Sequence, residues 1–232
     1  VMGYYPLFKR LLDIFLSAVG LFILSPFFYL AAIVIKLDSP GTVFFKQERI
    51  GKNLKPFQLL KFRSMRASRA EKQEDFEPGE AGRVTLIGSL LRKTKLDELP
   101  ELFNVLNGDM SIVGPRPEVR DYVTLNKRIF REIMDIKPGL TDYASIKYRN
   151  EEEMLRPLDD PARYYQQVIL PDKLRLAKRY KDEISLRTDL YIIANTLKTV
   201  LVHRSPRDLH IAKAVIYPIT RVANGDKIGK IP

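Results

Sequence analysis

The residues best suited to chemistry are the acidic pair Asp97-Glu98, which stands between Lys95 and Pro100. Pro100 is typical of the first turn of a helix, so the pair is predicted to lie at a helix N-terminus. Acidic residues there commonly cap the helix and complement its dipole. The same place also suits a phosphate, and a cation such as Mg²⁺ would then bridge carboxylate and phosphate. The pair therefore indicates either a capped helix or a metal-assisted phosphate site with Asp97 and Glu98 as ligands.

Basic residues elsewhere in the chain are candidates for binding the phosphates or the nucleotide of such a substrate: Lys61, Arg63, Arg92, Arg116 and Arg149. Arg116 stands between two prolines, which suits a bidentate grip on phosphate but also fits a solvated surface segment. Lys61 and Arg63 alternate with apolar residues, which predicts a strand with one basic face or an edge strand protected by its charges. Arg149 has tyrosines nearby and could pair with and stack on a nucleotide.

Residue types and motifs that the sequence lacks exclude several kinds of catalytic site. The chain has no cysteine, which excludes disulfides, thiolate nucleophiles and Cys-ligated metals. Its two histidines, His203 and His210, both lie near the C-terminus, which argues against a His-based zinc site or a serine triad. There is no Walker A or GxGxxG sequence and no Asp-x-Asp pair, which argues against the common nucleotide folds and against metal-dependent glycosyl transferases of the Asp-x-Asp type.

An uncharged apolar run over residues 14–35 is long enough to cross a bilayer. Ser25-Pro26 lies in its middle, where proline should kink or break a helix. Both flanks are basic, and the positive-inside rule prefers basic flanks on the cytoplasmic side. A helix that enters the membrane, bends at Ser25-Pro26 and returns keeps both flanks inside. We favour this re-entrant helix over a simple span and over a buried soluble helix.

The remaining sequence predicts a small hairpin followed by helices. Residues 43–66 have strand composition on either side of turn residues at 51–53. Residues 69–82 are acidic and aperiodic and indicate a loop. Residues 111–117 indicate a short strand that leads into a rigid Pro-Arg-Pro loop, and residues 141–150 an extended or irregular segment. Apolar spacing predicts helices over residues 85–95, 97–106, 118–136, 163–180 and 184–201.

The expected fold class is α+β and mainly helical, with three parts. A re-entrant membrane helix occupies residues 1–36 and is broken at Ser25-Pro26, a cytosolic catalytic domain follows over residues 37–202, and residues 203–232 form an extension of unknown role. The net charge of +11 suits nucleic acid, anionic lipid or a phosphorylated substrate. Beside a membrane segment, anionic lipid explains basic patches more simply than nucleic acid does, so no nucleic-acid partner is expected.

Four blocks of the chain, in order, resemble the bacterial sugar transferases, which are monotopic polyprenyl-phosphate phosphoglycosyl transferases. The blocks are KRLLDIFLSAVGLFILSPFFYLAAIVIKLDSPGTVFFKQERIG, KFRSM, SLLRKTKLDELPELFNVLNGDMSIVGPRPE and KPGLT. The resemblance runs from about residue 7 to 201 and implies the minimal form of the family, without additional N-terminal membrane helices. It also implies a bacterial inner membrane location with the catalytic domain on the cytoplasmic face.

The resemblance implies a chemistry for the acidic pair. Asp97 would be a nucleophile that attacks the sugar-bearing phosphate of a UDP-sugar, releases UMP and passes the phosphosugar to undecaprenyl phosphate. Glu98 would be a general base or orienting group, and Mg²⁺ would be required. Lys61, Arg63, Arg92 and Arg116 would match basic residues near the phosphates. Arg149 would match a residue associated with the nucleotide-sugar.

The segment after Pro138-Gly139 departs from the family pattern, in which a Gly-Trp-Ala-Gln run precedes Gly-Arg-Asn. Here Tyr143 replaces Trp, Ser145 replaces Gln and Tyr148 replaces Gly, which leaves the donor sugar open. Three other readings stand beside the main one: a membrane-anchored nucleic-acid-binding module, a transferase that moves only the sugar and releases UDP, and a non-catalytic scaffold of a polysaccharide assembly complex. The sequence does not fix the oligomeric state, and a homodimer is one option.

Overall fold

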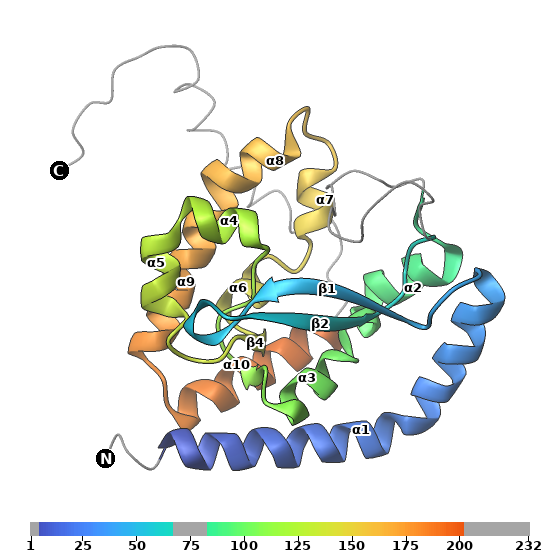
Figure 1. Ribbon diagram of the computed structural model, residues 1–232, viewed down its shortest axis with the longest axis horizontal. Coiled ribbons are helices and arrows are strands. Elements are labelled where there is room, and N and C mark those ends of the chain that lie inside the picture. The colour runs from blue at the N-terminus through green and yellow to red at the C-terminus, as the bar shows by residue number, and fades with distance from the viewer. Residues whose placement is uncertain (1–4, 67–82, 202–232) are drawn as a thin grey trace.

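The computed structural model describes residues 5–66 and 83–201. The expected loop at 69–82 and the C-terminal extension from 203 onward therefore lie outside the described residues. The described chain combines a long N-terminal helix, a two-stranded antiparallel hairpin, a two-stranded parallel pair and further helices (Figure 1). This confirms the predicted α+β, mainly helical class.

The apolar segment forms one helix, α1 (Tyr5–Asp38), which contains Pro26. The helix runs along the underside of the molecule and rises steeply towards its C-terminal end (Figure 1). Pro26 has no N–H to donate to the carbonyl of Phe22, one turn earlier, and the Ser25 hydroxyl donates to that carbonyl instead, at 2.8 Å. The Ser-Pro pair thus bends the helix without interrupting it.

The predicted hairpin is confirmed. Strand β1 (Phe44–Ile50) pairs antiparallel with β2 (Pro56–Phe62), from Phe44 opposite Phe62 to Ile50 opposite Pro56. A single turn of 3₁₀ helix, η1 (Lys52–Leu54), joins them, with Asn53 in the left-handed region. The predicted strand after residue 110 is β3 (Ser111–Val113), which pairs in parallel with β4 (Gly139–Thr141). This pairing brings two distant segments together.

Helix α2 (Leu86–Thr94) matches the expected helix at 85–95, and Thr85 caps it by accepting a hydrogen bond from the N–H of Gly88. The helix expected over 97–106 is shorter than predicted. A 3₁₀ turn, η3 (Leu96–Glu98), comes first, and α3 (Glu101–Asn107) begins only after Pro100. The acidic pair therefore lies in the turn before the helix.

Two expectations for the middle of the chain are wrong. The helix predicted over 118–136 is two helices, α4 (Arg120–Leu125) and α5 (Lys127–Ile133), separated at Asn126. The Asn126 side chain donates to the carbonyl of Tyr122, a local bond that competes with continued helix. The segment at 141–150, expected to be extended or irregular, is extended only at its start in β4 and contains α6 (Tyr143–Lys147). Asp142 caps this helix, and its carboxylate accepts from the N–H of Ser145 at 2.6 Å.

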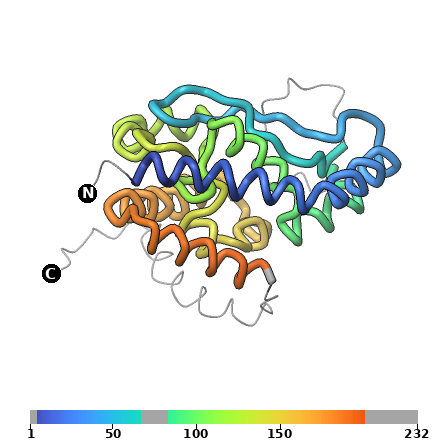
Figure 2. Tube along the Cα trace, turned by 90° about the horizontal axis from the view of Figure 1, so that it is seen from below, coloured from blue at the N-terminus to red at the C-terminus, as the bar shows by residue number. Residues whose placement is uncertain are grey.

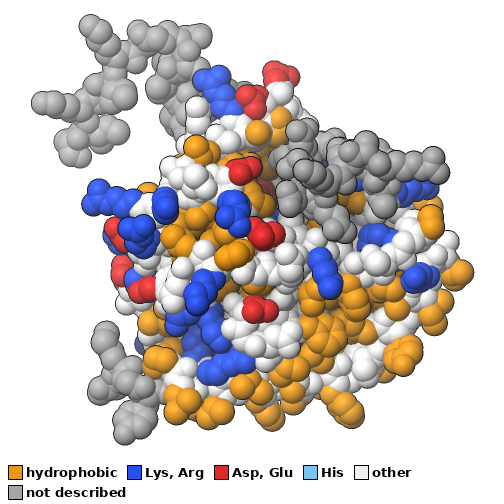
Figure 3. Space-filling model, viewed as in Figure 1, with side chains coloured by type: hydrophobic (Ala, Val, Ile, Leu, Met, Phe, Trp, Pro, Cys, Tyr) orange, Lys and Arg blue, Asp and Glu red, His pale blue; other side chains and the backbone are white. Residues whose placement is uncertain are grey.

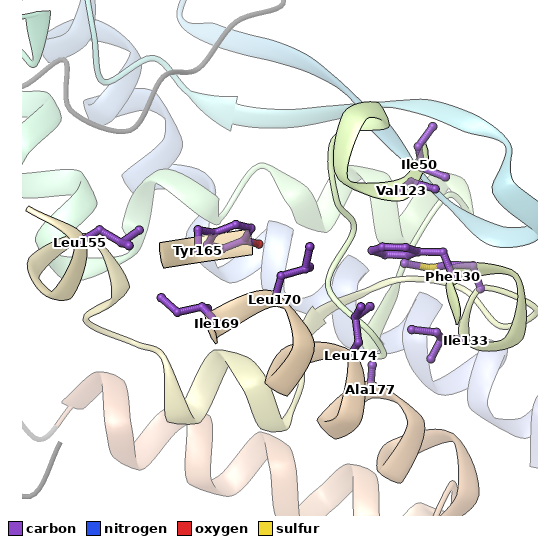
Figure 4. Close-up of a cluster of buried hydrophobic side chains, with 11 residues drawn as sticks. Ile50, Val123, Phe130, Ile133, Leu155, Tyr165, Ile169, Leu170, Leu174 and Ala177 are labelled. Atoms are coloured by element: carbon purple, nitrogen blue, oxygen red, sulfur yellow. The ribbon is translucent and has the colours of Figure 1, made fainter. Parts of the chain in front are cut away.

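The last part of the described chain is helical, as predicted, with more breaks than expected. Helix α7 (Glu151–Leu155) is followed by α8 (Pro161–Tyr164), a π-helical segment η4 (Tyr165–Ile169), α9 (Leu170–Asp182) and α10 (Leu186–Leu201). The apolar side of η4 and α9 packs against α5 and the end of β1 in one buried cluster, which includes Phe130, Leu170 and Leu174 (Figure 4). This cluster fixes the helical half of the domain to the hairpin.

The two ends of α1 contact the same domain. Near the N-terminus, Tyr5 and Lys9 donate to Asp189 in α10 at 2.7 and 2.6 Å, and α10 begins beside that end of α1 (Figure 2). Near the C-terminus, Ala31 and Ile35 pack in a buried cluster with Phe62. Along the helix, apolar side chains from Leu7 to Leu37 face outwards and form a hydrophobic band along the lower and right-hand edge of the face in Figure 3.

Candidate functional site

The acidic pair is held by a sharp change of chain direction. Lys95 ends α2 in the left-handed conformation, with φ of 60°, and starts the 3₁₀ turn that carries Asp97 and Glu98. The N–H groups of Glu98 and Leu99 donate to the carbonyls of Lys95 and Leu96, both at 3.3 Å. These two amides are therefore used within the turn and are not free to bind a phosphate.

Asn104 fixes this turn against the hairpin. Its side-chain amide donates to the carbonyl of Gln58 at 2.7 Å, and its oxygen accepts from the N–H of Leu60 at 2.9 Å. One buried side chain thus satisfies two backbone groups of β2 and sets the register of α3 against the strand. The next residue of the strand is Lys61, so the same contact places that lysine beside the acidic pair.

A cluster of opposite charges surrounds Glu98. The Lys61 ammonium donates to its carboxylate at 2.8 Å, and the Arg116 guanidinium forms a close ion pair with the same oxygen. Lys61 also lies 3.6 Å from the carboxylate of Glu101, which is 1% exposed. Lys61, Glu98, Glu101 and Arg116, with Asp97, are called the dyad cluster below. It joins two predicted basic residues to the predicted acidic pair.

The environments of the two carboxyl groups push their pKa values apart. Burial raises the pKa of Asp97 above its ordinary value, although Lys61 works against this. Burial alone would also raise the pKa of Glu98, but Arg116 and Lys61 hold it well below its usual range. Burial and then the charge of Glu98 raise the pKa of Glu101 to about 7. Such a divergence between neighbouring carboxyl groups is typical of sites where they have different roles.

A cavity of about 430 Å³ opens beside this cluster. Glu98 lines it, whereas Asp97, 8% exposed, lies just behind its wall. The basic residues in its wall are Arg49, Lys61, Arg92, Lys95, Arg116, Arg149, Arg156 and Lys173. The cavity is therefore suited to a polyanionic ligand.

Four of the five predicted basic residues line this cavity. Lys61 and Arg116 belong to the dyad cluster, Arg92 pairs with Glu152 at 2.9 Å, and Arg149 donates to the carbonyl of Val200 at 3.3 Å. Segments far apart in the sequence thus meet at one site.

Arg63 is the exception, because the structure does not bring it to the cavity. Strand β2 ends at Phe62, and the buried Arg63 side chain turns towards the end of α1. There it donates to the carbonyls of Ile35 and Ser39, at 3.2 and 2.6 Å. A cation at these carbonyls satisfies the C-terminus of the helix and complements its dipole. Its position indicates a structural role in place of the substrate contact predicted from the sequence.

Sequence reasoning missed several residues of the site. Glu101 lies one helical turn beyond Asp97 and Glu98, and that spacing could have identified it. Glu118 follows the Pro-Arg-Pro segment, is buried and accepts from the hydroxyl of Tyr165 at 2.6 Å. Arg49, in a strand, lies 3.7 Å from the same carboxylate. No local pattern links the segments of Arg49, Glu118 and Tyr165, so only the fold reveals that they meet.

The residues present fit a hard divalent cation. Asp97 Oδ1 and both carboxylate oxygens of Glu101 are buried without a hydrogen-bond partner among the described residues. Across residues 5–66 and 83–201, no three acidic or histidine side chains converge as a complete metal site. Asp97 could therefore hold Mg²⁺ only in part, with Glu98 as the second ligand predicted from the sequence, although Lys61 and Arg116 already bind one oxygen of Glu98. Substrate phosphate would complete the coordination, which is how proteins often bind this ion.

Comparison with known proteins gives the family. Residues 4–203 match the family model for bacterial sugar transferases, and the chain belongs to that family. The match covers the apolar helix, the hairpin, the acidic pair and the Pro-Arg-Pro segment.

Named relatives share much of this chain. The chain is 34% identical over 202 residues to the UDP-N-acetylgalactosamine-undecaprenyl-phosphate N-acetylgalactosaminephosphotransferase of Aeromonas hydrophila, covering 85% of this chain and 44% of that one. It is 38% identical over 165 residues to the UDP-glucose:undecaprenyl-phosphate glucose-1-phosphate transferase of Escherichia coli K12, covering 68% of this chain and 35% of that one. It is 36% identical to the exopolysaccharide production protein PSS of Rhizobium leguminosarum, covering 83% of this chain and 94% of that one. The chain spans less than half the length of the first two.

Proposed function

We propose that this chain transfers a sugar 1-phosphate from a UDP-sugar to undecaprenyl phosphate and releases UMP. The observation that carries the proposal is the dyad cluster beside a strongly basic cavity, on a domain with an exposed apolar helix. The names of the relatives support the same reaction class. Surface glycan assembly uses such a transfer as its first membrane step.

Two displacements at one phosphorus account for the chemistry. An oxygen of Asp97 attacks the sugar-bearing phosphorus, the bond from that phosphorus to the bridging oxygen breaks, and UMP leaves with the bond's electron pair. A phosphate oxygen of the polyprenyl acceptor then attacks the same phosphorus and frees the Asp97 carboxylate. The product is a polyprenyl diphosphate sugar. Dividing the transfer lets the two large substrates use one nucleophile in turn.

The surroundings of the two carboxylates support different roles. Asp97 has the raised pKa, and the more basic carboxylate is the better nucleophile. Glu98 is held by Lys61 and Arg116, so its charge orients those cations towards the phosphates. Arg116 can neutralise charge that develops on the phosphoryl oxygens. Because Asp97 lies behind the cavity wall, the proposal requires its side chain to rotate towards the bound donor.

Mg²⁺, when bound by Asp97 and Glu98 with the substrate diphosphate, would supply further neutralisation of phosphate charge. Side chains of the protein provide the other charges at the site. Arg116 and Lys61 hold the pKa of Glu98 low and so keep it ionised, and Arg92 and Lys95 extend the basic wall along the cavity.

We also propose that α1 is re-entrant, which places the domain on the cytoplasmic face of the inner membrane. Both ends of the helix contact one folded domain, through Lys9 with Asp189 and through Ile35 with Phe62. A helix that crossed the bilayer, about 30 Å thick, would put its two ends on opposite sides, where one folded domain could not contact both. The bend at Pro26 and the basic flanks agree with an entry and return on one side.

Nucleotide release tests the reaction. The full chain in detergent is mixed with Mg²⁺, undecaprenyl phosphate and a panel of UDP-sugars, beside Asp97→Asn and Glu98→Gln variants. We expect UMP from the wild type and none from Asp97→Asn. A labelled phosphosugar should stay on the protein when the acceptor is omitted, because the first displacement needs no acceptor.

Other outcomes separate the alternatives. UDP as the product would assign the chain to transferases that move only the sugar. UMP formed equally well by Asp97→Asn would remove the covalent mechanism, and a trapped phosphosugar in Asp97→Asn but not in Glu98→Gln would exchange the two roles. No release with any donor would favour the scaffold.

Topology is tested by labelling, which the absence of native cysteine makes clean. Pro6→Cys and Pro40→Cys, both at exposed positions flanking the apolar run, are treated with a membrane-impermeant maleimide in oriented vesicles. Labelling of both only from the cytoplasmic side is expected. Labelling from opposite sides would establish a span.

A further inference from the structure

The cavity extends beyond the dyad cluster to a second group of residues with different chemistry. Tyr122, Tyr148, Tyr165, Glu118 and Lys173 all line it, and they are called the aromatic end below. Tyr122 and Tyr165 lie with ring centroids 4.9 Å apart, inclined at 40°. No part of the two displacements proposed above uses these residues.

Charges at the aromatic end are paired. Lys173 lies 2.6 Å from the carboxylate of Glu151 and 4.0 Å from that of Glu118, and Arg49 lies 3.7 Å from Glu118. Two cations thus face two anions, unlike the cation-rich wall beside Glu98. The balance makes this end a poor site for another phosphate and a better one for a neutral polar ring.

We propose that the aromatic end binds the pyrimidine base of the nucleotide-sugar donor. A pyrimidine has two flat faces that aromatic side chains can stack on, and its edge carries hydrogen-bond donors and acceptors. Tyr122 and Tyr148, both half-buried, supply rings, while Glu118 supplies an acceptor and Lys173 donors. The inference rests on the proposed function, because it takes the donor to be a nucleotide.

Spacing within the chain agrees with one ligand that reaches both ends. Arg116, in the dyad cluster, and Glu118, in the aromatic end, are two residues apart, so their Cα atoms are separated by at most about 7 Å. That length is comparable to the ribose that links a base to its phosphate. Arg49 donates to the intervening carbonyl of Pro117 at 3.4 Å, which fixes the segment between the two groups.

Ligand binding by the full chain in detergent tests this subsite. The dissociation constants of UMP and of ribose 5-phosphate, which lacks the base, are measured by titration calorimetry for wild type and Tyr122→Leu. We expect Tyr122→Leu to weaken UMP about tenfold or more and to leave ribose 5-phosphate within about twofold. Tyr148→Leu should act in the same direction.

Matched control variants separate a loss of UMP binding from a loss of folding. Tyr164→Leu removes a tyrosine that packs on the same buried cluster but does not line the cavity, and it should leave UMP binding unchanged. Tyr122→Phe keeps the ring and should bind UMP as the wild type does. Thermal unfolding of each variant confirms that the chain is folded.

Three outcomes would overturn the subsite. Equal weakening of UMP and ribose 5-phosphate by Tyr122→Leu would mean a structural role. Unchanged UMP binding with an altered choice among UDP-sugars would assign this end to the sugar, and unchanged binding of every ligand would leave it without a ligand role. A wild-type chain that binds no UMP would instead remove the proposed donor class, so the two failures are distinct.

Discussion

The buried carboxylates of this protein form two groups that differ in how fully their oxygens are satisfied. Asp13 and Asp189 hold α1 to the domain, and each oxygen of each has a donor. In the dyad cluster, by contrast, Asp97 Oδ1 and both oxygens of Glu101 are buried without a hydrogen-bond partner among the described residues. Burying an unpaired oxygen costs about 1–3 kcal/mol. The satisfied group holds α1 to the domain, whereas the unsatisfied oxygens of the dyad cluster lie where the proposed function requires a ligand.

The same substitution should act in opposite ways on the two groups. Asp97→Asn is expected to lower UMP formation by a factor on the order of 10⁴ or more, since an amide cannot act as the nucleophile. Its free energy of unfolding should stay equal or rise, because a desolvated carboxyl group has been replaced by a neutral one. Activity assays and thermal unfolding in detergent measure both. A clear loss of stability would place Asp97 in the structural group.

Asp189→Asn should have the opposite profile. An amide in this place cannot accept from Tyr5, Lys9 and Tyr180 together, and it leaves the Lys9 charge without its partner. We expect a loss of about 3–5 kcal/mol in the free energy of unfolding. Activity per folded molecule should be retained at low temperature. Asp182→Asn is the control, since Asp182 is exposed and does not line the cavity. Loss of activity without loss of stability would break the comparison.

The two groups of carboxylates also show which features could be predicted from the sequence and which could not. The hairpin, α2 and the acidic pair follow from local signals, namely strand composition around Gly51 and a capping Thr85. Local signals do not predict which buried oxygens receive a hydrogen bond. Asp13, for example, accepts from Ser111 and Ile112, about a hundred residues later in the chain. The same limit explains Arg63, whose role depends on where α1 ends. Re-entry of α1, Mg²⁺ and the catalytic roles stay predictions.

Short helices form an intermediate case. Asp142 with Ser145 is a local cap that could have predicted α6, yet the segment lacks apolar periodicity and was expected to be irregular. The separation of α4 from α5 likewise depends on a single side chain, Asn126. Each of these signals depends on a single side chain, whereas an apolar periodicity must extend over several turns before it can be recognised.

Glu101 gives a pH test of the unsatisfied group. Its pKa of about 7 is above the ordinary value of 4.5, so the folded chain binds this proton more tightly than the unfolded chain does. Stability from this group is therefore full below about pH 4.5 and falls as the pH rises through about 7, by up to about 3 kcal/mol. Glu101→Gln should remove that decline, measured as thermal midpoints between pH 5 and 8. The exposed Glu132→Gln is the control, and an unchanged slope in Glu101→Gln would contradict the assignment.

The smallest effect is expected at the bend of α1, where an oxygen is satisfied by a side chain in place of the backbone. Ser25→Ala removes the donor to the Phe22 carbonyl, which Pro26 cannot replace, and should cost about 1 kcal/mol in lipid bilayers. In a Pro26→Ala background the backbone N–H is restored, so the same Ser25→Ala change should be neutral. The double-mutant cycle, read from thermal unfolding in nanodiscs, isolates this coupling. Equal effects in both backgrounds would mean that the hydroxyl does not compensate for proline, and that the bend has another cause.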